Sequence, residues 1–300
     1  MRGHVEEFLK EKDIPYRSGV SAATLSTFRI GGVCDVATPV CLQQLMELTT
    51  YCAYHDHAYR IIGRGSNLLF GDDRIEALLI KTDLLDAAEI GAGYALVQCG
   101  CSLPHLARRV AALGYADLTF AVGIPGSVGG AVYMNAGALG KEFSSLVTWV
   151  EVYDPLRREI RTYFNKELNY SYRNSRFQSG NEVVLRASLR LELIAKKDEI
   201  LDVMRLNIKK RASSQPLEMP SVGSAFRRPA PDIAIGKLLD DLGLKGLRRG
   251  GAAISEKHAG FIVNLGGATA RDVKELTVAV QKIVEEKTGI HLIPEFQEIT

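Results

Sequence analysis

The sequence predicts an α+β protein built in three parts, at residues 1–83, 84–196 and 197–300. Three observations support this fold class. The chain has 300 residues, which is more than one small hydrophobic core usually serves. The first part alternates short strand-like and helix-like segments. The second part consists mainly of strands with alternating apolar faces, and the third part changes to helical spacing.

Apolar spacing and glycine pairs define the elements of the first part. Leucine and methionine recur at helical intervals across residues 41–55, which predicts a helix there. Residues 25–30 are expected to form a strand that Gly31-Gly32 breaks, with residues 33–37 as its hairpin partner. The other expected elements are a short helix at 4–12 and strands at 59–62 and 78–80.

The second part is expected to be mostly sheet. A strand at 95–99 leads into a helix at 103–113, for which Ser102 is a suitable N-cap and Gly114 a suitable C-cap. Alternating apolar residues then predict strands at 147–153, 159–163 and 183–193.

The third part begins where Ala195-Lys196-Lys197-Asp198 ends the strand pattern. Thr269 is expected to cap a long helix through Lys287, whose apolar residues lie on one face. The other expected elements are helices at 200–210 and 233–242, a strand at 261–264 and two short strands at the end of the chain.

The composition is that of an ordinary globular protein, with 46% hydrophobic and 24% charged residues. A net charge of +2 argues against a dedicated nucleic-acid binder. No apolar run reaches the roughly 18 residues that a membrane helix needs, and the charged N-terminal segment is no secretory signal. We therefore expect a cytoplasmic protein without membrane insertion, most simply a monomer.

The cysteines and histidines predict neither a disulfide framework nor a structural metal. There are five cysteines, an odd number, and no Cys-x-x-Cys or His-x-x-x-His pattern occurs. Cys99 and Cys101 are expected to be small apolar fillers at the end of a buried strand, although their spacing leaves reactivity open.

Two glycine-rich stretches follow apolar runs in the first half of the chain. They are Gly63-Arg64-Gly65-Ser66-Asn67-Leu68-Leu69 and Ala121-Val122-Gly123-Ile124-Pro125-Gly126-Ser127-Val128-Gly129-Gly130. Glycine lets the backbone approach a ligand and direct N–H groups at an anion, so two such loops suggest a long anionic ligand such as a dinucleotide. Neither is a nucleoside-triphosphate loop or the glycine motif of a Rossmann domain. For each loop alone, a simple tight turn is an equally good interpretation.

Three further segments carry polar residues of catalytic type. The segment Tyr170–Phe177 is polar and aromatic, and alone it would be read as a loop with solvated arginines. A long proline-containing loop, Arg211–Phe226, holds Ser224 directly after Gly223, where a turn serine is the plain alternative. Glu295 follows a proline in an apolar terminal strand, where a lone glutamate is usually an exposed edge residue. These signals alone name no reaction.

Eight motifs in order carry a resemblance to a known family. They are Phe28-Arg29-Ile30-Gly31-Gly32, Gly63-Arg64-Gly65-Ser66-Asn67-Leu68-Leu69, Gly123-Ile124-Pro125-Gly126-Ser127-Val128-Gly129-Gly130, Asn135-Ala136-Gly137-Ala138, Tyr172-Arg173-Asn174-Ser175-Arg176-Phe177, Gln215-Pro216, Gly223-Ser224-Ala225-Phe226 and Lys257-His258-Ala259-Gly260-Phe261-Ile262-Val263-Asn264. Over nearly the whole chain, the sequence resembles the UDP-N-acetylenolpyruvoylglucosamine reductases, also called UDP-N-acetylmuramate dehydrogenases. These are flavin enzymes of peptidoglycan precursor synthesis, and hence of cell-wall biogenesis, cell shape and cell division.

The resemblance implies a fold, cofactors and partners. It implies FAD on a two-subdomain fold of the vanillyl-alcohol-oxidase type, at 1–83 and 84–196, with a smaller substrate-binding domain at 197–300. It also implies NADPH as reductant and a UDP-sugar as substrate. The stretch between Arg173 and Ser224 is short, as in the compact type that lacks an inserted tyrosine loop, so no tyrosine is assigned a role. The residues after Glu295 also differ from the valine-arginine common in the family.

The resemblance also assigns residues to roles. Arg173, Ser224 and Glu295 match the catalytic positions. Arg211, Lys245 and Asn264 match or lie near positions expected to contact the substrate or its diphosphate. The cofactor-binding positions are Arg29, Gly63, Gly65, Ser66, Asn67, Gly123, Pro125, Gly126, Ser127, Gly129, Gly130, Asn135 and Gly137.

The implied chemistry is hydride transfer from reduced FAD to C3 of the enolpyruvyl ether and proton transfer to C2. Arg173 would stabilise the charge that develops on the carboxylate, a neutral Glu295 would donate a hydrogen bond to it, and Ser224 would deliver the proton. Two alternatives remain open: an FAD oxidase of the same fold that uses oxygen, and a UDP-sugar-binding protein without catalysis.

Overall fold

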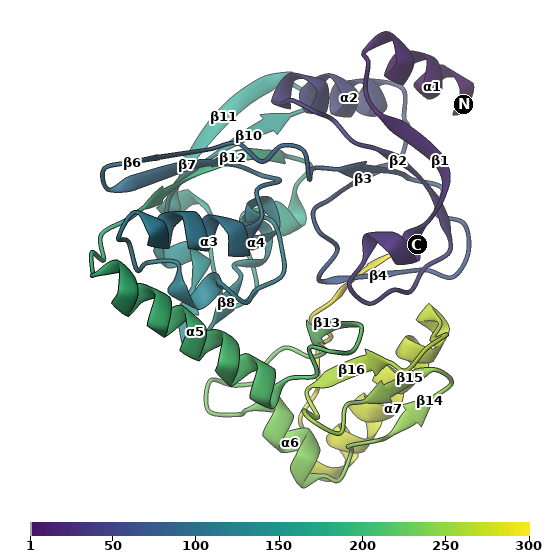
Figure 1. The fold of residues 1–300 in the computed structure, drawn as a ribbon. Helices are drawn as coiled ribbons and strands as arrows, with labels where there is room; N and C mark the ends of the chain where they lie inside the picture. The colour runs from purple at the N-terminus through teal and green to yellow at the C-terminus, as the bar shows by residue number, and fades with distance from the viewer. Residues whose placement is uncertain (1) are drawn as a thin grey trace. The chain divides into compact units, whose positions relative to one another are not determined.

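The computed structural model describes residues 2–300, except for the side chains of Arg2 and Gly3, and it divides into two compact units (Figure 1). The first unit holds the residues up to Ser18, Asp35–Arg64 and Ala77–Lys209. The second unit holds Gly19–Cys34, Gly65–Glu76 and Lys210–Thr300.

One sheet of the first unit has the strand order β1-β2-β5-β3, and β2 and β3 both run parallel to β5. The strands are β1 (Tyr16–Ser21), β2 (Val33–Ala37), β3 (Tyr59–Ile62) and β5 (Leu78–Lys81). Helices α1 (Arg2–Glu11) and α2 (Leu42–Tyr54) pack against it and contribute Leu9, Leu45 and Leu48 to a core shared with Ile80.

A second sheet of the first unit is antiparallel throughout, in the order β11-β10-β12-β7-β6. The strands are β6 (Ala88–Gly91), β7 (Tyr94–Gln98), β10 (Val147–Asp154), β11 (Glu159–Phe164) and β12 (Val183–Arg190). Helices α3 (Leu103–Ala112) and α4 (Val128–Met134) lie along one face of it (Figure 1). The core between helices and sheet includes Val97, Leu106, Val132 and Val150.

Short elements complete the first unit. They are the hairpin of β8 (Gly137–Ala138) and β9 (Lys141–Glu142) and the 3-10 turns Thr119–Ala121, Phe143–Ser145, Asn165–Glu167 and Arg176–Ser179. Helix α5 (Lys197–Ser214) follows β12 in sequence.

The second unit contains an antiparallel sheet in the order β13-β16-β15-β14, against which α7 packs. Its elements are the 3-10 turn Ala22–Leu25, β4 (Leu68–Phe70), β13 (Ser221–Ser224), α6 (Ile235–Asp241), β14 (Arg248–Arg249), β15 (Ala252–Ile254), β16 (Phe261–Asn264), α7 (Ala270–Thr288) and β17 (Gln297–Ile299). Strand β17 pairs in parallel with β4, so the end of the chain joins the first glycine-rich stretch.

The predicted α+β class and most of the predicted elements are confirmed, with ends that differ by a few residues. Thr269 caps α7 as predicted: its side chain accepts a hydrogen bond from the Asp272 N–H, and the Asp272 carboxylate accepts one from the Thr269 N–H. Ser102 occupies the N-cap position of α3, but its side chain makes no capping bond.

The predicted strand at 25–30 is wrong. Residues 22–25 form a 3-10 turn, and Arg29 adopts a left-handed backbone with φ of 56°. The apolar residues Phe28 and Ile30 suggested a strand. Both lie in the core of the second unit, but the segment that carries them is irregular. The neighbour of β2 on that side is instead β1, which has few apolar residues to reveal it.

Two smaller differences concern the glycine stretch and the chain end. Helix α4 begins at Val128, inside the second glycine-rich stretch, for which the sequence predicts a loop. Of the two terminal strands expected, the structure has β17 and, before it, a single bridge between Pro294 and Phe226.

The predicted three-part division at 1–83, 84–196 and 197–300 cuts the chain differently from the two compact units. Residues 4–300 form three hydrophobic cores, and Phe28, Ile30 and Leu69 belong to the same core as α7 and β16. Segments 19–34 and 65–76 therefore group with the C-terminal residues. The three-part division stays a prediction.

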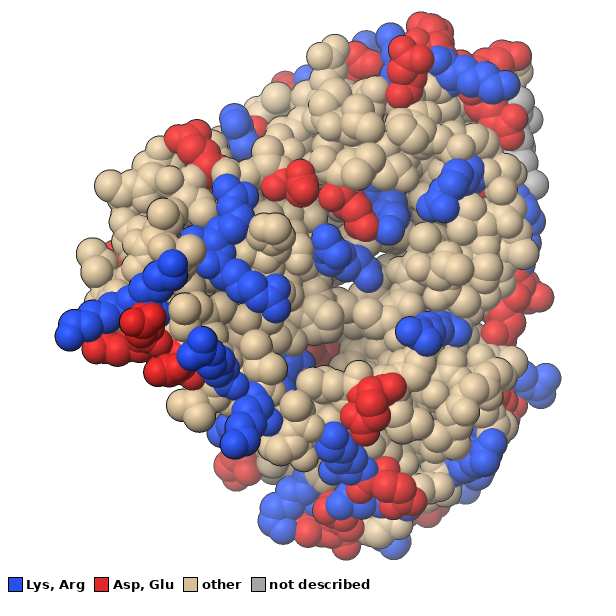
Figure 2. Space-filling view, viewed as in Figure 1, with Lys and Arg blue, Asp and Glu red and all other residues tan. Residues whose placement is uncertain are grey.

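Basic and acidic side chains are interspersed over the face seen in Figure 2, in keeping with the net charge of +2. Within residues 2–300, no helix is both long and apolar enough to cross a bilayer. In the same residues, no three histidine, cysteine, aspartate or glutamate side chains are grouped so as to hold a metal ion.

Candidate active site

The two glycine-rich stretches meet inside the first unit. Gly63 directly follows β3, and a Cβ atom added to it would overlap the hydroxyl of Ser127. Ser127 is the N-cap of α4, and its hydroxyl accepts a hydrogen bond from the Gly130 N–H at 3.3 Å. The absence of a side chain at Gly63 therefore lets the first stretch pack against the start of the second.

Part of the second stretch uses its N–H groups within the protein. The N–H of Val128 donates to the carbonyl of Cys101 at 2.9 Å, and that of Gly129 donates to the carbonyl of Cys99 at 2.7 Å. A Cβ atom on Gly129 would also lie only 2.9 Å from the Cys99 Cβ. Close packing inside the protein thus accounts for the glycine at 129.

The exposed edge of the same stretch has N–H groups that are not used within the described protein. Gly130 is exposed, and the nearest atom to a Cβ placed there would be the Ser127 hydroxyl at 3.5 Å. Gly126 is half-buried, and the main-chain N–H groups of Gly126 and Ser127 have no hydrogen-bond partner among residues 2–300. A bare backbone edge with two adjacent N–H donors suits a bound diphosphate.

Cys99 and Cys101 are buried thiols, as the filler interpretation predicted. Burial raises the pKa of Cys99 to about 12 and that of Cys101 to about 11. Both therefore stay protonated at neutral pH, and neither is a nucleophile.

The first glycine-rich stretch continues into the second unit at Gly65. A Cβ atom there would overlap the carbonyl oxygen of Leu25, so glycine is required by packing. Asn67, two residues on, donates from Nδ2 to the carbonyl of Glu295 at 3.0 Å. Arg29 is exposed, between the buried Phe28 and Ile30, so its side chain is available to a ligand.

Ser224 ends strand β13 at an irregularity in the sheet. Ser221 pairs with Val263 and Ser224 with Phe261, so β13 has one residue more than β16 between these pairs. This bulge includes Gly223, whose φ of 82° is accessible mainly to glycine. The Ser224 hydroxyl donates to the carbonyl of Phe226 at 3.0 Å and is half-buried. Ser224 is therefore a bulge residue rather than an ordinary turn serine.

Glu295 lies beside the residue that follows Ser224 in the second unit. Its N–H donates to the carbonyl of Ala225, the residue after Ser224, at 2.9 Å. Glu295 is half-buried, so the alternative of an exposed edge glutamate does not describe it. The structure thus places the main-chain segments of two of the three predicted catalytic residues next to each other, although these residues are 71 positions apart in sequence.

Arg173 belongs to the first unit, at the tip of a tight turn. Ser171 and Asn174 exchange two main-chain hydrogen bonds at 3.2 and 3.1 Å, which leaves Tyr172 and Arg173 between them. Arg173 has φ of 54°, and a left-handed backbone costs a non-glycine residue roughly 1–2 kcal/mol. Strain of this kind is often found at functional sites.

The guanidinium of Arg173 binds two main-chain carbonyls. Nη1 donates to the carbonyl of Asn135 at 3.3 Å and Nη2 to that of Gly137 at 3.0 Å. The Asn135 side chain is fully buried, with 0% of its surface exposed. A ligand therefore has no access to the Asn135 amide in this conformation, although the resemblance placed Asn135 among cofactor contacts.

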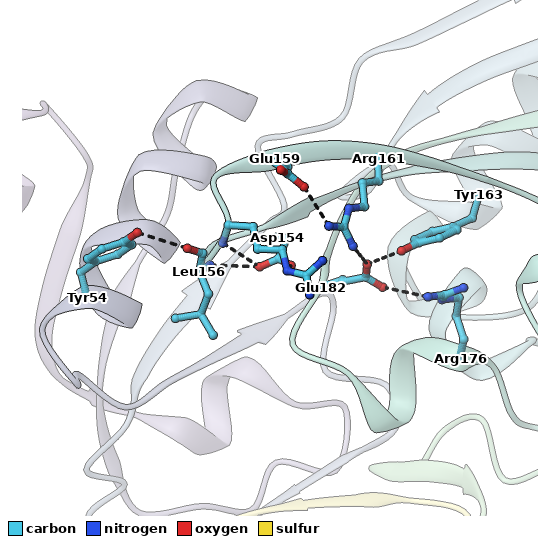
Figure 3. A network of polar contacts seen from close by, with 9 residues as sticks. Tyr54, Asp154, Leu156, Glu159, Arg161, Tyr163, Arg176 and Glu182 are labelled. Carbon is cyan, nitrogen blue, oxygen red and sulfur yellow. Dashed lines mark hydrogen bonds and ion pairs between the residues drawn. The ribbon is translucent and has the colours of Figure 1, made fainter.

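The segment after Arg173 is anchored by a polar network (Figure 3). Arg176 lies 3.6 Å from the Glu182 carboxylate, and its Cζ lies 3.6 Å from the ring centroid of Tyr163. The Tyr163 hydroxyl donates to the same carboxylate at 2.6 Å. Arg176 is thus a structural anchor, and the expectation of a loop with solvated arginines is wrong for it.

The three predicted substrate contacts differ in how their side chains are engaged. Arg211 is in the last turn of α5, its Nε donates to Gln215, and burial lowers the pKa of its guanidinium. Lys245 forms an ion pair with Asp240 at 2.7 Å. Arginine and lysine are the residue types that bind a diphosphate.

The side-chain amide of Asn264 makes four hydrogen bonds within the second unit. Its Nδ2 donates to the carbonyls of Phe28 and Arg29, and its Oδ1 accepts from the N–H groups of Gly266 and Ala268. An amide has two donors and two acceptor lone pairs, so these four bonds use its full capacity. The geometry gives Asn264 the task of holding the Arg29 segment to β16.

Sequence reasoning did not single out Gln178 and Glu142, which both lie near the Arg173 turn. Gln178 donates to the carbonyl of Arg173 at 3.0 Å, and Glu142 accepts from the Asn135 amide at 2.9 Å. Proximity to the motif at 172–177 was the only signal for Gln178, and no local pattern pointed to Glu142.

Two family profiles match the chain. The profile of the FAD binding domain matches residues 35–162. The profile of the C-terminal domain of UDP-N-acetylenolpyruvoylglucosamine reductase matches residues 215–299, which include Ser224, Lys245, Asn264 and Glu295.

Full-length relatives support the same family. The UDP-N-acetylenolpyruvoylglucosamine reductase of Caldicellulosiruptor bescii is 41% identical over 297 residues, which cover 98% of this chain and 94% of the relative. That of Thermotoga petrophila is 44% identical over 243 residues, 81% of this chain and 84% of the relative. The crystal structure of the reductase from Thermus caldophilus superposes with a TM-score of 0.81 at 33% identity, covering 96% and 99% of the two chains. The chain therefore belongs to the UDP-N-acetylenolpyruvoylglucosamine reductase family of oxidoreductases, and it carries an FAD-binding domain.

Proposed function

We propose that this enzyme reduces UDP-N-acetylenolpyruvoylglucosamine to UDP-N-acetylmuramate with NADPH, through bound FAD, as a step of peptidoglycan precursor synthesis. The observation that carries the proposal is the pairing of Glu295 with the residue after Ser224, at 2.9 Å, in the unit that matches the family's C-terminal domain. This main-chain contact holds the segment with a hydroxyl-bearing residue and the segment with a carboxyl group next to each other, and both residue types suit the addition of hydrogen to an enol ether.

The chain's own residues fit FAD. The exposed Gly130 edge and the N–H groups of Gly126 and Ser127 offer a diphosphate a surface that a side chain would fill. Arg29, Gly63, Gly65, Ser66, Gly123, Pro125 and Gly129 are proposed to line or shape the cofactor site with them. FAD would accept a hydride from NADPH and pass it to the substrate.

The reduction adds a hydride at C3 and a proton at C2 of the enolpyruvyl group, and the protein must supply the proton. Negative charge develops on the substrate carboxylate before the proton arrives. The planar guanidinium of Arg173 matches a carboxylate in bidentate form, and Glu295 in its neutral form would donate to the same group. We assign the proton transfer to the Ser224 hydroxyl, which in the structure donates to the Phe226 carbonyl at 3.0 Å.

The remaining assignments follow from this activity. Arg211 and Lys245 are proposed to bind the diphosphate of the UDP-sugar. A monomeric cytoplasmic enzyme that binds neither nucleic acid nor membrane is the form we propose.

The test is a pair of anaerobic half-reactions on the purified holoenzyme. NADPH should reduce the flavin and remove its absorption near about 450 nm, and UDP-N-acetylenolpyruvoylglucosamine should restore it with one equivalent of UDP-N-acetylmuramate formed. If the enolpyruvyl sugar does not reoxidise the reduced flavin and oxygen admitted afterwards does, the protein is instead an oxidase. A protein that binds the sugar without flavin or turnover would indicate a non-catalytic binder.

A further inference from the structure

Asn135 is the most fully enclosed polar side chain near Arg173. It is 0% exposed, and its amide makes three hydrogen bonds inside the first unit. Nδ2 donates to the Glu142 carboxylate at 2.9 Å and to the carbonyl of Ser171 at 3.0 Å, and Oδ1 accepts from the Ser144 N–H at 3.0 Å. A buried amide with this many partners fixes the segments that it joins.

The joined segments are the two that determine where Arg173 lies. Ser171 is one end of the tight turn that carries Arg173. Asn135 itself supplies one of the two carbonyls that bind the Arg173 guanidinium, and Gly137 supplies the other. One side chain therefore holds both the base of the arginine and the atoms that its far end contacts.

The backbone of Asn135 adds to this arrangement. It has φ of 44° and caps the C-terminus of α4 in a left-handed conformation. That conformation turns the chain from α4 into the β8–β9 hairpin, which brings the carbonyls of 135 and 137 to the same side of Arg173. Asparagine is among the few residues other than glycine that adopt it at low cost.

Reactions that develop charge depend on donors held within fractions of an ångström, whereas an unrestrained arginine side chain occupies many rotamers. We propose that Asn135 is a positioning residue that fixes the Arg173 guanidinium for the substrate carboxylate, and that it does not contact the cofactor through its side chain. The inference rests on the proposed function only for the identity of the group that Arg173 meets.

The decisive variant is Asn135→Gly, because glycine keeps the left-handed backbone and removes only the amide. The matched control is Asn165→Ala. The Asn165 Nδ2 also donates two hydrogen bonds, to the carbonyls of Ser144 and Val147 in the same unit, but Asn165 makes no bond to Arg173 or its turn. Both variants lose amide hydrogen bonds to neighbouring segments of the first unit, so a difference between them reports the loss of the amide bond that ties Asn135 to the Arg173 turn.

In Asn135→Gly we expect unchanged FAD affinity and normal flavin reduction by NADPH. Reoxidation by the enolpyruvyl sugar should slow by about 10- to 100-fold, the range for a misplaced reacting group. In an Arg173→Lys background the same change should add little, since the two residues would act as one unit. Asn165→Ala should leave both half-reactions near normal.

Two results would overturn the proposal. One is loss of FAD from Asn135→Gly with normal reoxidation in the molecules that keep it, which would make Asn135 a cofactor residue. The other is additivity with Arg173→Lys. If Asn135→Gly fails to fold, Asn135→Asp replaces it, because it preserves the shape and the acceptor for Ser144 but loses both donors.

A readout without substrate separates this inference from the proposed function. Backbone amides of residues 171–174 should exchange hydrogen faster in Asn135→Gly than in wild type or Asn165→Ala. Equal exchange would overturn the positioning role even if the enzyme proved to be a reductase. Faster exchange in an enzyme that ignores the enolpyruvyl sugar would support the positioning role and refute the proposed activity.

Discussion

The Asn67 amide donates from Nδ2 to the carbonyl of Glu295 at 3.0 Å, across 228 residues of sequence. The main chain supports the same contact, because the carbonyl of Asn67 accepts the N–H of Gln297 at 2.8 Å and Leu68 then pairs with Gln297 in parallel register. A residue of the first glycine-rich stretch thus holds the proposed catalytic glutamate. The first glycine-rich stretch therefore holds the C-terminal segment in place, in addition to its proposed contact with the cofactor.

Asn67→Ala should loosen the end of the chain. We expect faster hydrogen exchange across residues 295–299 and a loss of about 1 kcal/mol in the free energy of unfolding, the usual value of one hydrogen bond. Thr24→Ala is the control, since its hydroxyl also donates to one main-chain carbonyl, that of Ser21, in the same unit. Unchanged exchange at 295–299 in Asn67→Ala would show that β4–β17 pairing alone fixes Glu295.

Sequence patterns predicted the elements that interactions between neighbouring residues determine. The capping box of α7 and the apolar face of that helix can be read from Thr269 to Lys287, and the structure has both. The strand predicted at 25–30 is absent because an irregular backbone, and not a strand, buries Phe28 and Ile30. The carbonyl of Phe28 accepts a hydrogen bond from the amide of Asn264, which is far away in sequence. Short-range pattern contains no information on that contact.

The candidate site shows the same limit of prediction from sequence. Glycines at 63 and 129 could be recognised as unusual, but sequence could not tell that their neighbours would be Ser127 and Cys99 rather than a ligand. The family resemblance named Asn135 and Asn264 as contacts, yet both amides are bonded within the protein. Only tertiary structure shows which polar side chains are already engaged.

Gly130→Ala and Gly129→Ala should have opposite effects on the apoprotein. At Gly130 the space for a Cβ is open, and alanine favours a helix by up to about 1 kcal/mol, so the apoprotein should be as stable as wild type or more so. FAD affinity should nevertheless fall about tenfold or more if the flavin approaches this backbone. Gly129→Ala would press on Cys99 and should destabilise the apoprotein by about 1–3 kcal/mol.

Thermal unfolding of the apoproteins and titration with FAD measure both effects. The contrast matters because Gly129→Ala could lose FAD merely through instability, whereas Gly130→Ala could not. Normal FAD affinity in Gly130→Ala would remove this edge of α4 from the cofactor site.

His258 should make stability depend on pH. Burial, assisted by the charge of Lys245, lowers the pKa of His258, while a main-chain hydrogen bond and the charge of Asp240 oppose the shift. Its Nδ1 accepts the Gly260 N–H at 3.1 Å, which also requires a neutral ring nitrogen. Because the unfolded chain then binds the proton more readily, stability should be lost as the pH falls below about 6.5 toward the lowered pKa.

His258→Asn should reduce this loss, since its Oδ1 can still accept the Gly260 N–H but does not titrate. Urea midpoints at about pH 7.5 and about pH 5.5 give the pH-dependent difference for each protein. His291→Asn, at an exposed histidine, is the control. A wild-type difference that His258→Asn leaves unchanged would assign the pH dependence to other groups.

Ser224→Ala should stop the second half-reaction and spare the first. Flavin reduction by NADPH needs no proton donor at C2, so it should proceed at the wild-type rate. Reoxidation by the enolpyruvyl sugar should slow by a factor of about 10² or more, the range for a lost general acid. The lost bond to the Phe226 carbonyl should cost about 1 kcal/mol of stability, too little to unfold the protein.

Two further variants make the result specific. Ser224→Cys should retain part of the reoxidation rate, because a thiol can also deliver a proton. Ser221→Ala removes another hydroxyl from the same strand, three residues earlier, and should leave both half-reactions unchanged. Stopped-flow traces of flavin absorbance separate the two steps. If Ser224→Ala is reoxidised as fast as wild type, the hydroxyl serves only the bulge that ends β13, and the proton must come from another group.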